Sequence, residues 1–533
     1  MEYNLADLFE SIVDVVPDRE ALVYVDRPGS GAERRLTYAE LDVAANRIGH
    51  HLLDRGIRPG EHLGLHLYNG VEYLQTVLGC LKARIVPVNV NYRYVEEELV
   101  YLYRDADLVA LVFDAEFSDR VSAAARRAEK LRHLLRVGAP GDPGTPYADA
   151  EAAGSPERGF AARSGDDQLI IYTGGTTGMP KGVMWRQEDL FFAGLGGGAP
   201  TGEPVKRPEE LAERVAAGGS EITFFPTAPL MHGTSTLTAF IAFHFGQRVV
   251  IHRRFAAEDV LRTVEKEKVS SVSLVGDAML RPLVDALDGP LKGTDCSSLF
   301  SVSSSGAVLS QTVRRRFQEL VPHALLLNNF GSSESGFNGT ATEDAGAGSG
   351  FRIRVNSRTR VVDPVTREPV AAGEAGRVAQ CGHVPLGYYN DPVKTAETFF
   401  EKDGERWVLL GDMATVDEDG VVTVLGRGSQ CINTGGEKVY PEEVEQALKS
   451  HPDVYDALVT GVPDARWGHR VAAVVQLREG AARPSLEEIR AHCRDRLAGY
   501  KLPRRLVITE QIRRSPSGKA DYRWARQVAA AGG

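Results

Sequence analysis

Residues 172–182 read Tyr172-Thr173-Gly174-Gly175-Thr176-Thr177-Gly178-Met179-Pro180-Lys181-Gly182, and they follow the apolar run Gln168-Leu169-Ile170-Ile171. The apolar run predicts a strand, and the glycines and threonines after it predict a loop. Glycines leave backbone N–H groups uncovered, and threonine hydroxyls and one ammonium stand among them. Such a loop can bind a polyphosphate, because uncovered backbone amides and a compact cation attract a group of dense negative charge. It is not a Walker-type loop, because Met179-Pro180 separates Gly178 from Lys181. The alternative interpretation is a surface turn.

Length and composition narrow the class of protein. A chain of 533 residues is too long for one hydrophobic core, so two or more domains are expected. A net charge of -10 argues against broad nucleic-acid binding, which needs a basic face. The five cysteines show no zinc or disulfide spacing, the N-terminus shows no signal peptide, and no apolar run is long enough for a transmembrane segment. These features predict a cytoplasmic protein.

Helical and strand patterns alternate in the first 160 residues. Thr37 to Glu40 forms a capping box, and apolar residues then recur at helical spacing until Gly56. Residues 62–67 and 85–90 are predicted strands, and the segment between them, 71–83, is a predicted helix. This rhythm predicts an α/β fold with mainly parallel sheets covered by helices.

The last hundred residues predict a separate small α/β unit. A helix begins at Pro441, strands are expected at 457–460, 471–475 and 505–509, and Ser485 caps a second helix. The domain boundary is predicted within Gly426-Arg427-Gly428-Ser429. This gives an N-terminal domain of residues 1–426 and a C-terminal domain of residues 427–533, with a hinge near Ser429. The alternative for these glycines is a simple β-turn.

The glycine-rich loop resembles the signature loop of the adenylate-forming superfamily, which includes acyl-CoA synthetases, luciferases and peptide-synthetase adenylation domains. The resemblance covers most of the chain, from about Leu36 to Lys519. It implies a large N-terminal AMP-binding domain that adenylates an acid, and a small mobile C-terminal α/β domain. It also implies that ATP phosphates contact Thr173, Gly174, Gly175, Thr177 and Gly178. Thr176 and Lys181 are then expected to be catalytic, with Thr176 also a Mg²⁺ ligand.

A second motif is Asn328-Asn329-Phe330-Gly331-Ser332-Ser333-Glu334. It resembles the family's aromatic-Gly-x-Thr-Glu motif, with Phe330 in place of the commoner tyrosine and Ser333 in place of threonine. The resemblance implies that Phe330 stacks near adenine, that Ser333 meets the α-phosphate and that Glu334 holds Mg²⁺. A carboxylate suits that ion, which prefers oxygen ligands. Asn329, Gly331 and Ser332 are included in the expected nucleotide site.

Three weaker matches complete the expected nucleotide site. Residues 304–309 resemble a Ser-Gly-Gly-Ala-Pro-Leu turn of the family, although Ser305 and Val308 replace the usual glycine and proline. This match adds Ser305, Gly306 and Ala307 to the expected nucleotide site. Asp412 matches an aspartate that accepts both ribose hydroxyls, since two vicinal donors suit one carboxylate. Arg427 matches an arginine that reaches ribose or phosphate. Ser429 replaces the usual aspartate or lysine at the hinge.

Glu334 is expected to be catalytic as well as a metal ligand, and two further residues are also expected to be catalytic. Lys519 ends the string Arg514-Ser515-Pro516-Ser517-Gly518-Lys519, which resembles the loop of the family's catalytic lysine. His232 lies in Pro229-Leu230-Met231-His232-Gly233, which resembles a segment that faces both acid and phosphates. Taken alone, Lys519 would be a solvated surface residue and His232 a core histidine.

The acceptor of the activated acid is expected to be coenzyme A. Gly435 and Gly436 lie in a segment that resembles the one facing the site during thioesterification, and glycines let backbone approach a thin pantetheine arm. The sequence thus predicts an AMP-forming acyl-CoA synthetase acting on a long-chain fatty acid or a bulky sterol side-chain acid. The acid pocket is expected to use Trp185, Phe191–Gly198, His232, Thr236 and Ser303–Gly306.

Other functions stay open from the sequence. The enzyme could load a carrier-protein thiol instead of CoA, and a non-catalytic nucleotide-binding homologue or a kinase-like ATPase are further alternatives. The expected partners are a small carboxylic acid, ATP and CoA, without nucleic acid, and a homodimer is the candidate assembly.

Overall fold

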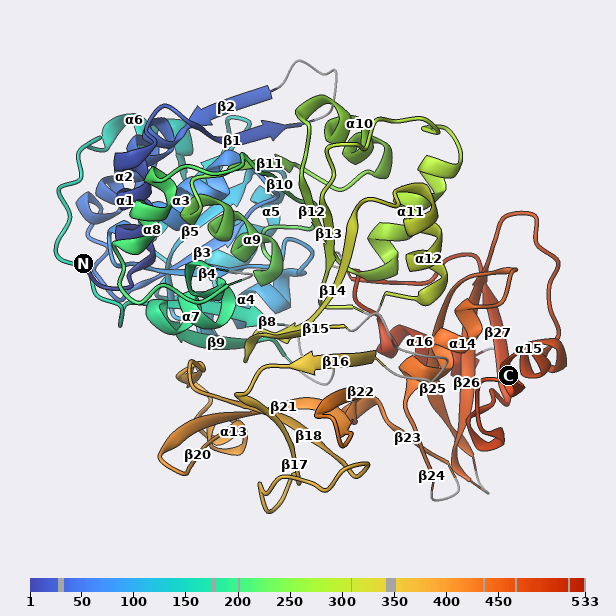
Figure 1. Ribbon diagram of the computed structural model, residues 1–533. Helices are drawn as coiled ribbons and strands as arrows, with labels where there is room; N and C mark the ends of the chain where they lie inside the picture. The colour runs from blue at the N-terminus through green and yellow to red at the C-terminus, as the bar shows by residue number, and fades with distance from the viewer. Residues whose placement is uncertain are drawn as a thin grey trace.

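The computed structural model describes residues 1–26, 33–173, 179–199, 202–307, 309–341, 351–434, 437–464, 467–515 and 518–531. Figure 1 shows three regions: a large N-terminal part, an orange antiparallel section below it, and an orange-to-red C-terminal unit beside that section. Within these described ranges, no helix has both the length and the hydrophobicity needed to cross a membrane.

One sheet of the described chain has eight strands. They run in the order β19 (Gly387–Tyr388), β9 (Lys181–Arg186), β8 (Gln168–Thr173), β4 (Val86–Asn89), β3 (His62–His66), β5 (Leu108–Asp114), β6 (His133–Val137) and β7 (Thr145–Pro146). Strands β8 to β7 are parallel, whereas β8 and β9 form an antiparallel pair that flanks the glycine-rich loop. The predicted strands at 62–67 and 85–90 are therefore confirmed as β3 and β4.

A second sheet has fourteen strands in the described ranges. Its parallel half contains β14 (Leu325–Ser332), β13 (Ser301–Ser304), β12 (Ser271–Leu274), β10 (Thr223–Pro226), β11 (Arg248–His252) and β1 (Glu20–Val25), and β2 (Glu33–Thr37) pairs antiparallel at its edge. Its other half is antiparallel and contains β15 (Gly336–Ala341), β16 (Phe351–Val355), β22 (Val421–Arg427), β21 (Glu405–Val416), β18 (Ala375–Cys381), β17 (Thr359–Val362) and β20 (Phe399–Lys402).

The antiparallel half was not anticipated among the expected parallel sheets. Its strands are joined by short connections, as between β21 and β22, where Gly420 has a φ of +76° and Asp417 accepts from the N–H of Val421 at 2.8 Å. Such a tight turn permits only an antiparallel pair, whereas parallel strands need a longer crossover. The turn signal is present in the sequence at Asp417-Glu418-Asp419-Gly420.

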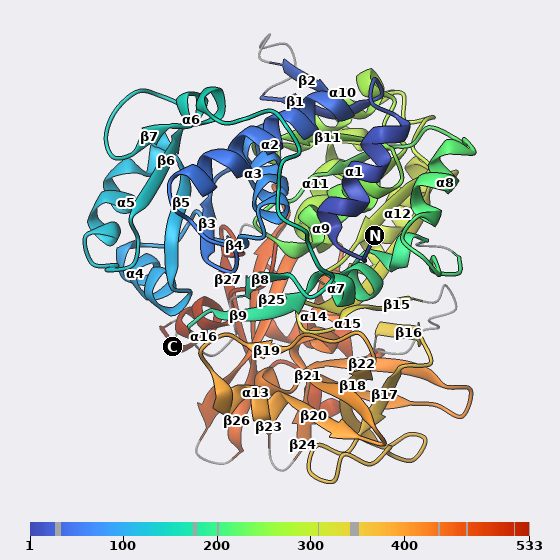
Figure 2. The same cartoon turned by 90° about the vertical axis from the view of Figure 1, so that its left-hand side faces the viewer.

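Helices form three layers around the two sheets. The layer between the sheets contains α1 (Leu5–Val15), α2 (Tyr38–Asp54), α3 (Val71–Lys82) and α9 (Gly233–His244). The outer layer on the second sheet contains α10 (Ala257–Glu267), α11 (Gly276–Asp288) and α12 (Gln311–Leu320), and that on the first contains α4 (Glu96–Asp105) and α5 (Ser118–Ala125). Figure 2 shows α2 and α3 between the sheets. Shorter helices are α6 (Tyr147–Ala153), α7 (Gln187–Gly194), α8 (Glu210–Ala216) and α13 (Pro392–Thr398).

Helix α2 illustrates how the sequence builds the central layer. The Thr37 side chain accepts from the N–H of Glu40, and the Glu40 side chain accepts from the N–H of Thr37, so the predicted capping box is confirmed. The apolar residues Leu41, Ile48 and Leu52 are fully buried on one face of the helix. Burying each such side chain contributes about 1.5–3 kcal/mol.

The C-terminal unit has its own five-stranded sheet among the described residues. The strands are β24 (Glu437–Val439), β23 (Ile432–Thr434), β26 (Gly468–Leu477), β25 (Val454–Asp464) and β27 (Arg505–Thr509). Helices α14 (Pro441–Lys449) and α15 (Leu486–Arg494) cover one face, and α16 (Tyr522–Ala531) covers the other. The predicted strands and both predicted helix starts are confirmed. The predicted hinge residue Ser429 lies in a short 3₁₀ helix, Gly428–Gln430, directly after β22.

Candidate functional site

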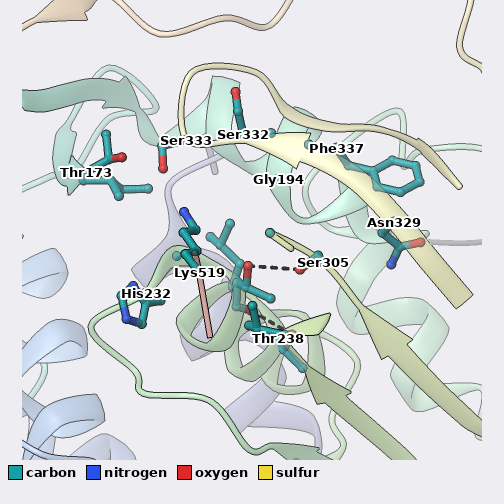
Figure 3. Close-up of a pocket in the computed structure, with 18 of the residues that line it drawn as sticks. Thr173, Gly194, His232, Thr238, Ser305, Asn329, Ser332, Ser333, Phe337 and Lys519 are labelled. Atoms are coloured by element: carbon teal, nitrogen blue, oxygen red, sulfur yellow. Dashed lines mark hydrogen bonds between the residues drawn. The ribbon is translucent and has the colours of Figure 1, made fainter. Parts of the chain in front are cut away.

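A cavity of about 1520 Å³ lies where the N-terminal part meets the loop that carries Lys519. Thr173 at the end of β8, Ser305 after β13 and Asn329 near the end of β14 all line it, together with His232 just before α9. The carboxyl ends of parallel strands meet at one edge of a sheet, and ligands of α/β proteins bind there. Figure 3 shows Thr173, His232, Ser305, Ser333 and Lys519 arranged around this space.

Lys519 lies in the cavity against the turn that follows β13. Gly306 has a φ of +74°, and a Cβ built there would lie 3.7 Å from Cε of Lys519, so the lysine passes directly over this glycine. Beside it, the hydroxyls of Thr234 and Ser305 lie 3.2 Å apart. Ser305 and Gly306 thus line the cavity as expected, whereas Ala307 packs against the hydrophobic core under α11 and α12.

The second motif lies along the end of β14. Asn329, Phe330, Gly331, Ser332 and Ser333 all line the cavity. The indole N–H of Trp185 donates to the Ser333 carbonyl at 2.9 Å, and the hydroxyl of Tyr388 donates to Oε1 of Glu334 at 3.1 Å. Trp185 thus holds the motif from the cavity lining, and Tyr388 holds it from β19. A Cβ at Gly331 would lie 2.2 Å from the Gly336 carbonyl oxygen, so only glycine fits there.

Glu334, Asp412 and Arg427 do not line the cavity, but their charges act on Lys519, which does. Nε of Arg427 lies 3.2 Å from Oδ1 of Asp412 on the neighbouring strand. Burial raises the pKa of Asp412 although Arg427 opposes this, and the Asp412 carboxylate raises the pKa of Arg427. Enclosure by protein, and then Arg427, lower the pKa of Lys519, while Glu334 and Asp412 oppose that change. The site therefore holds two cations that a polyanionic ligand would stabilise.

His232 is neutral in this environment. Burial, and then the nearby positive charge of Lys519, lower the pKa of His232 to about 3. Its Nε2 atom is buried and has no hydrogen-bond partner among the described residues. The imidazole can therefore offer a hydrogen bond to a ligand in the cavity, but it is not a charged group at neutral pH.

Lys181 lies at the base of the loop rather than in the cavity lining. It begins β9, and its Nζ atom lies 2.8 Å from Oδ2 of Asp391 and 5.3 Å from the centroid of the Tyr388 ring. Asp391 and Tyr388 belong to the string Gly387-Tyr388-Tyr389-Asn390-Asp391, which sequence reasoning did not single out. Gly174, Gly175, Thr176, Thr177 and Gly178, as well as Gly435 and Gly436, lie outside the described residues.

The expected acid pocket is placed only in part. Trp185, residues 192–196, His232, Ser303 and Ser305 line the cavity, but Phe191 is buried in the core between the sheets. Gly197, Gly198 and Ser304 are also outside the lining, and the Ser304 hydroxyl accepts from the N–H of Gly276. Thr236 donates to the Leu230 carbonyl at 2.5 Å and faces a separate small cavity of about 60 Å³.

One face of α9 forms a wall that sequence reasoning missed. Its cavity-lining residues are Gly233, Thr234, Leu237, Thr238 and Ile241, and Phe245 follows at the helix end. Their spacing of three or four residues places them along one side of the helix. The opposite side, with Ala239, Phe240 and Phe243, is buried. The helical spacing of these residues could have identified the face that lines the cavity. Both faces of α9 are apolar, however, so the sequence pattern is also that of a fully buried helix.

Arg514 holds the loop that carries Lys519, and it was quoted in the motif without a role. Its Nε and Nη2 atoms donate to the two carboxylate oxygens of Asp456 at 2.7 and 2.8 Å, and Nη1 donates to the Gly518 carbonyl at 3.0 Å. The loop is closed by Ser515 and Lys519, whose backbone groups bond at 2.8 Å. Nζ of Lys449 lies 3.5 Å from both Asp456 and Asp277 of α11, so this cluster also joins the C-terminal unit to the N-terminal part.

Replacing Arg514 with lysine tests this positioning role. Lysine keeps the positive charge beside Asp456 but lacks the planar fork that reaches both Asp456 and Gly518. The family resemblance implies that Lys519 acts in acyl-adenylate formation, so we expect that step to slow about 10- to 100-fold, because misplacing a catalytic group by about 1 Å has an effect of this size. Single-turnover rates of acyl-adenylate formation and of thioester formation from a supplied acyl-adenylate, together with thermal melting, measure it. Arg496→Lys is the surface control, and equal slowing of both steps would contradict positioning.

The residues present fit a Mg²⁺ ion that is brought in by a nucleotide. The described residues contain no group of three or more His, Cys, Asp or Glu side chains that could hold a metal by themselves. The carboxylate available for the ion is that of Glu334, whose Oε1 also accepts a hydrogen bond from the Tyr388 hydroxyl. One carboxylate is what Mg²⁺ uses when phosphates and water supply its other ligands.

Comparisons with known proteins agree with this arrangement. A family model described as AMP-binding enzyme matches residues 9–389, and one described as AMP-binding enzyme C-terminal domain matches residues 443–519. A medium/long-chain-fatty-acid–CoA/3-oxocholest-4-en-26-oate–CoA ligase of Mycobacterium tuberculosis is 46% identical over 536 residues, covering 98% of this chain and 96% of that protein. A 3-oxocholest-4-en-26-oate–CoA ligase of Rhodococcus rhodochrous is 43% identical over 544 residues, covering 99% of this chain and 96% of that protein.

A solved structure shares the fold over the whole chain. The crystal structure of the anthranilate CoA ligase AuaEII in complex with anthranoyl-AMP has a TM-score of 0.86 at 23% identity, and the match covers 100% of this chain and 98% of that one. On the strength of the family model and of the relatives above 40% identity, the chain belongs to the AMP-binding enzyme family.

Proposed function

We propose that the protein is an ATP-dependent acid–CoA ligase that acts on long-chain or sterol side-chain acids. An acid and ATP give an acyl-adenylate and pyrophosphate, and the CoA thiol then displaces AMP to give the thioester. The observation that carries this proposal is that Lys519 lines a large cavity and interacts electrostatically with Arg427, Glu334 and Asp412. The names of the relatives at 43–46% identity support both the reaction and the class of acid.

The chain's own groups can bind ATP in one orientation. Phe330 offers a ring for the adenine and Asp412 offers a carboxylate for the ribose hydroxyls, and residues 174–178 are proposed from their sequence to supply backbone amides to the phosphates. Ser333 lies on the wall of the same cavity as Thr173 and Lys519. Bound in this way, the α-phosphate would lie near Lys519.

Adenylation places negative charge on the acid, the α-phosphate and the leaving pyrophosphate at the same time. Lys519 can hold the carboxylate against the α-phosphate and stabilise the five-coordinate phosphorus, and Arg427 adds a second cation. His232 can donate or accept one hydrogen bond without adding charge. Mg²⁺, held by Glu334 and proposed also for Thr176, would neutralise the phosphate charge when bound.

We propose that the second half-reaction uses the same cavity after residues 427–533 rotate about Ser429. The rotation would withdraw Lys519 and bring Gly435 and Gly436 to the cavity, where CoA enters. Lys181 is proposed to steady the phosphate loop through its ion pair with Asp391. The cytoplasmic location and the homodimer stay predictions.

Product analysis tests the proposed function. The purified protein is given ATP, Mg²⁺, CoA and one acid at a time from acetate, benzoate, octanoate, palmitate and a sterol side-chain acid. We expect AMP, pyrophosphate and the CoA thioester in equal amounts, with palmitate and the sterol acid preferred. ADP as product, or activity only with a carrier protein while CoA is inert, would contradict the proposal.

Replacing Glu334 with glutamine tests the metal assignment. The amide keeps the shape of the side chain but loses the charge that attracts Mg²⁺. We expect the Mg²⁺ concentration for half-maximal adenylation to rise about 10- to 100-fold, a range typical of weakened metal sites. A magnesium titration of pyrophosphate release measures it, with Glu397→Gln on the surface as control. An unchanged titration midpoint would remove Glu334 from the metal site.

A further inference from the structure

The acid-binding half of the cavity is a long groove between α9 and the second sheet. The lining face of α9 runs from Gly233 beside the reacting end to Phe245 at the far end. A helix of 12 residues is about 18 Å long, because each residue adds about 1.5 Å. The groove is therefore long enough to hold an acid with an extended hydrophobic body.

The facing wall is built by alternate residues of parallel strands. The cavity is lined by Ser301 and Ser303 on β13, by Ser305 directly after β13, and by Leu325, Leu327 and Asn329 on β14. Alternate residues share one face of a strand, and each step along a parallel strand rises about 3.3 Å. Ser301 thus lies about 13 Å from Ser305, away from Lys519.

The far end of this wall is one row of side chains across four strands. The register pairs Phe224 with Ser271, Ser271 with Ser301, and Ser301 with Leu325, and all four residues line the cavity. Neighbours in register point to the same face of a sheet. The outer members of the row are apolar, and Phe300 and Phe245 add further apolar surface at this end. Two hydroxyls therefore stand alone in the middle of an apolar row.

The two hydroxyls have a donor to spare. Oγ of Ser271 and Oγ of Ser301 lie 3.0 Å apart, so one donates to the other. Two hydroxyls carry two protons, and their mutual bond uses only one. No other partner for either hydroxyl exists in the described ranges of the chain. The nearby Gln247 cannot serve in their place, because its Oε1 accepts from the N–H of Ile222 and its Nε2 contacts the carbonyls of Ser220 and Phe245.

We propose that Ser271 and Ser301 form a polar subsite that donates a hydrogen bond to an oxygen at the distal end of a hydrophobic acid. This inference rests on the proposed function, and it narrows the acid to one with a ketone or hydroxyl opposite its carboxylate. Ligand sites gain specificity from a few polar groups in an apolar lining, and the serine pair fits that description. A sterol side-chain acid with a ring ketone has this pattern, whereas a plain fatty acid ends in a methyl group.

Paired substrates test the subsite. The protein is assayed with a sterol side-chain acid that bears a 3-keto group and with the same acid lacking that oxygen, and kcat/KM is measured for each. We expect the keto acid to be preferred by the unchanged protein. In the Ser271→Ala/Ser301→Ala double variant we expect that preference to fall about tenfold, since one hydrogen bond to a neutral acceptor has an effect of this order.

A spectroscopic readout and matched variants complete the test. A conjugated ketone absorbs at longer wavelength when it accepts a hydrogen bond, so the bound enone acid should show this shift in the unchanged protein and lose it in the double variant. Ser301→Thr keeps a hydroxyl and should keep the preference. Ser270→Ala removes the adjacent hydroxyl, which bonds to the Thr223 N–H outside the groove, and should also keep it.

Two results separate the subsite from the proposed function. An unchanged keto preference and an unchanged absorption shift in the folded double variant would overturn the subsite while thioester formation continues. No thioester from either acid in the unchanged protein would instead overturn the proposed function on which the subsite rests.

Discussion

Replacing Lys519 with alanine is expected to slow acyl-adenylate formation about 100- to 1000-fold, the size of effect seen when one preorganised donor is lost from a transition state. Lys519 is the cation that passes over Gly306 into the cavity, and its lowered pKa reflects its enclosure there. Alanine removes the charge but leaves the bond from the Gly518 N–H to the Ser515 carbonyl. A supplied acyl-adenylate should still react with CoA at close to the normal rate, because in the proposed mechanism Lys519 is withdrawn from the cavity in that step.

Rapid-quench measurement of both half-reactions checks this division. Pyrophosphate release reports the first step, and thioester formation from synthetic acyl-adenylate reports the second. Lys130→Ala, at an exposed ion pair with Asp107, is the control for surface charge. A Lys519→Ala protein that loses both half-reactions equally would contradict the role of Lys519.

Replacing Ile241 with tryptophan is expected to lower kcat/KM for palmitate about 100-fold or more, and to affect octanoate much less. Ile241 lies on the cavity face of α9, between Leu237 near the reacting end and Phe245 at the far end. An indole at this point would fill the groove, and overpacking by a bound long acid has an energetic cost of about 1–3 kcal/mol or more. A short acid ends before the obstruction.

Steady-state kinetics over a series of acids of increasing length measures this effect. The matched control is Ile241→Val, which leaves the groove open and should keep the preference for long acids. If Ile241→Trp lowers kcat/KM for every acid by the same factor, the acid does not follow α9, and the assignment of the groove is wrong.

The sequence predicted those parts of the fold that local rules determine. Thr37 and Glu40 form the predicted capping box, and residues 62–66 and 86–89 are parallel strands. The C-terminal helices begin at Pro441 and after Ser485, where a proline and a capping serine indicated them. Each of these features depends on neighbouring residues, so a local pattern is enough.

Residues named from separate short motifs lie together in the structure. Thr173, Ser305, Phe330, Ser333 and His232 come from distant parts of the sequence, and all line one cavity. Asp412 and Arg427 face each other across β21 and β22 as an ion pair. The position of Lys181 on Asp391 was not predicted, because that contact joins residues 210 positions apart.

What the sequence could not reveal depends on packing between distant elements. The row from Phe224 to Leu325 exists only because four parallel strands align in register, and nothing in the local sequence at Ser271 indicates its neighbour Ser301. The face of α9 that lines the groove is almost as apolar as the face that is buried. Arg514 was visible in a motif, but its bonds to Asp456 and Gly518 follow from the fold of the C-terminal unit.

The most direct measurement follows a labelled oxygen from the acid. Palmitate or a sterol side-chain acid with ¹⁸O in its carboxylate is turned over with ATP, Mg²⁺ and CoA, and the products are analysed by mass spectrometry. Attack of the carboxylate on the α-phosphate, followed by release from the acyl-adenylate, leaves a labelled oxygen in AMP. Unlabelled AMP, or label in inorganic phosphate, would show that no acyl-adenylate forms and would contradict the account.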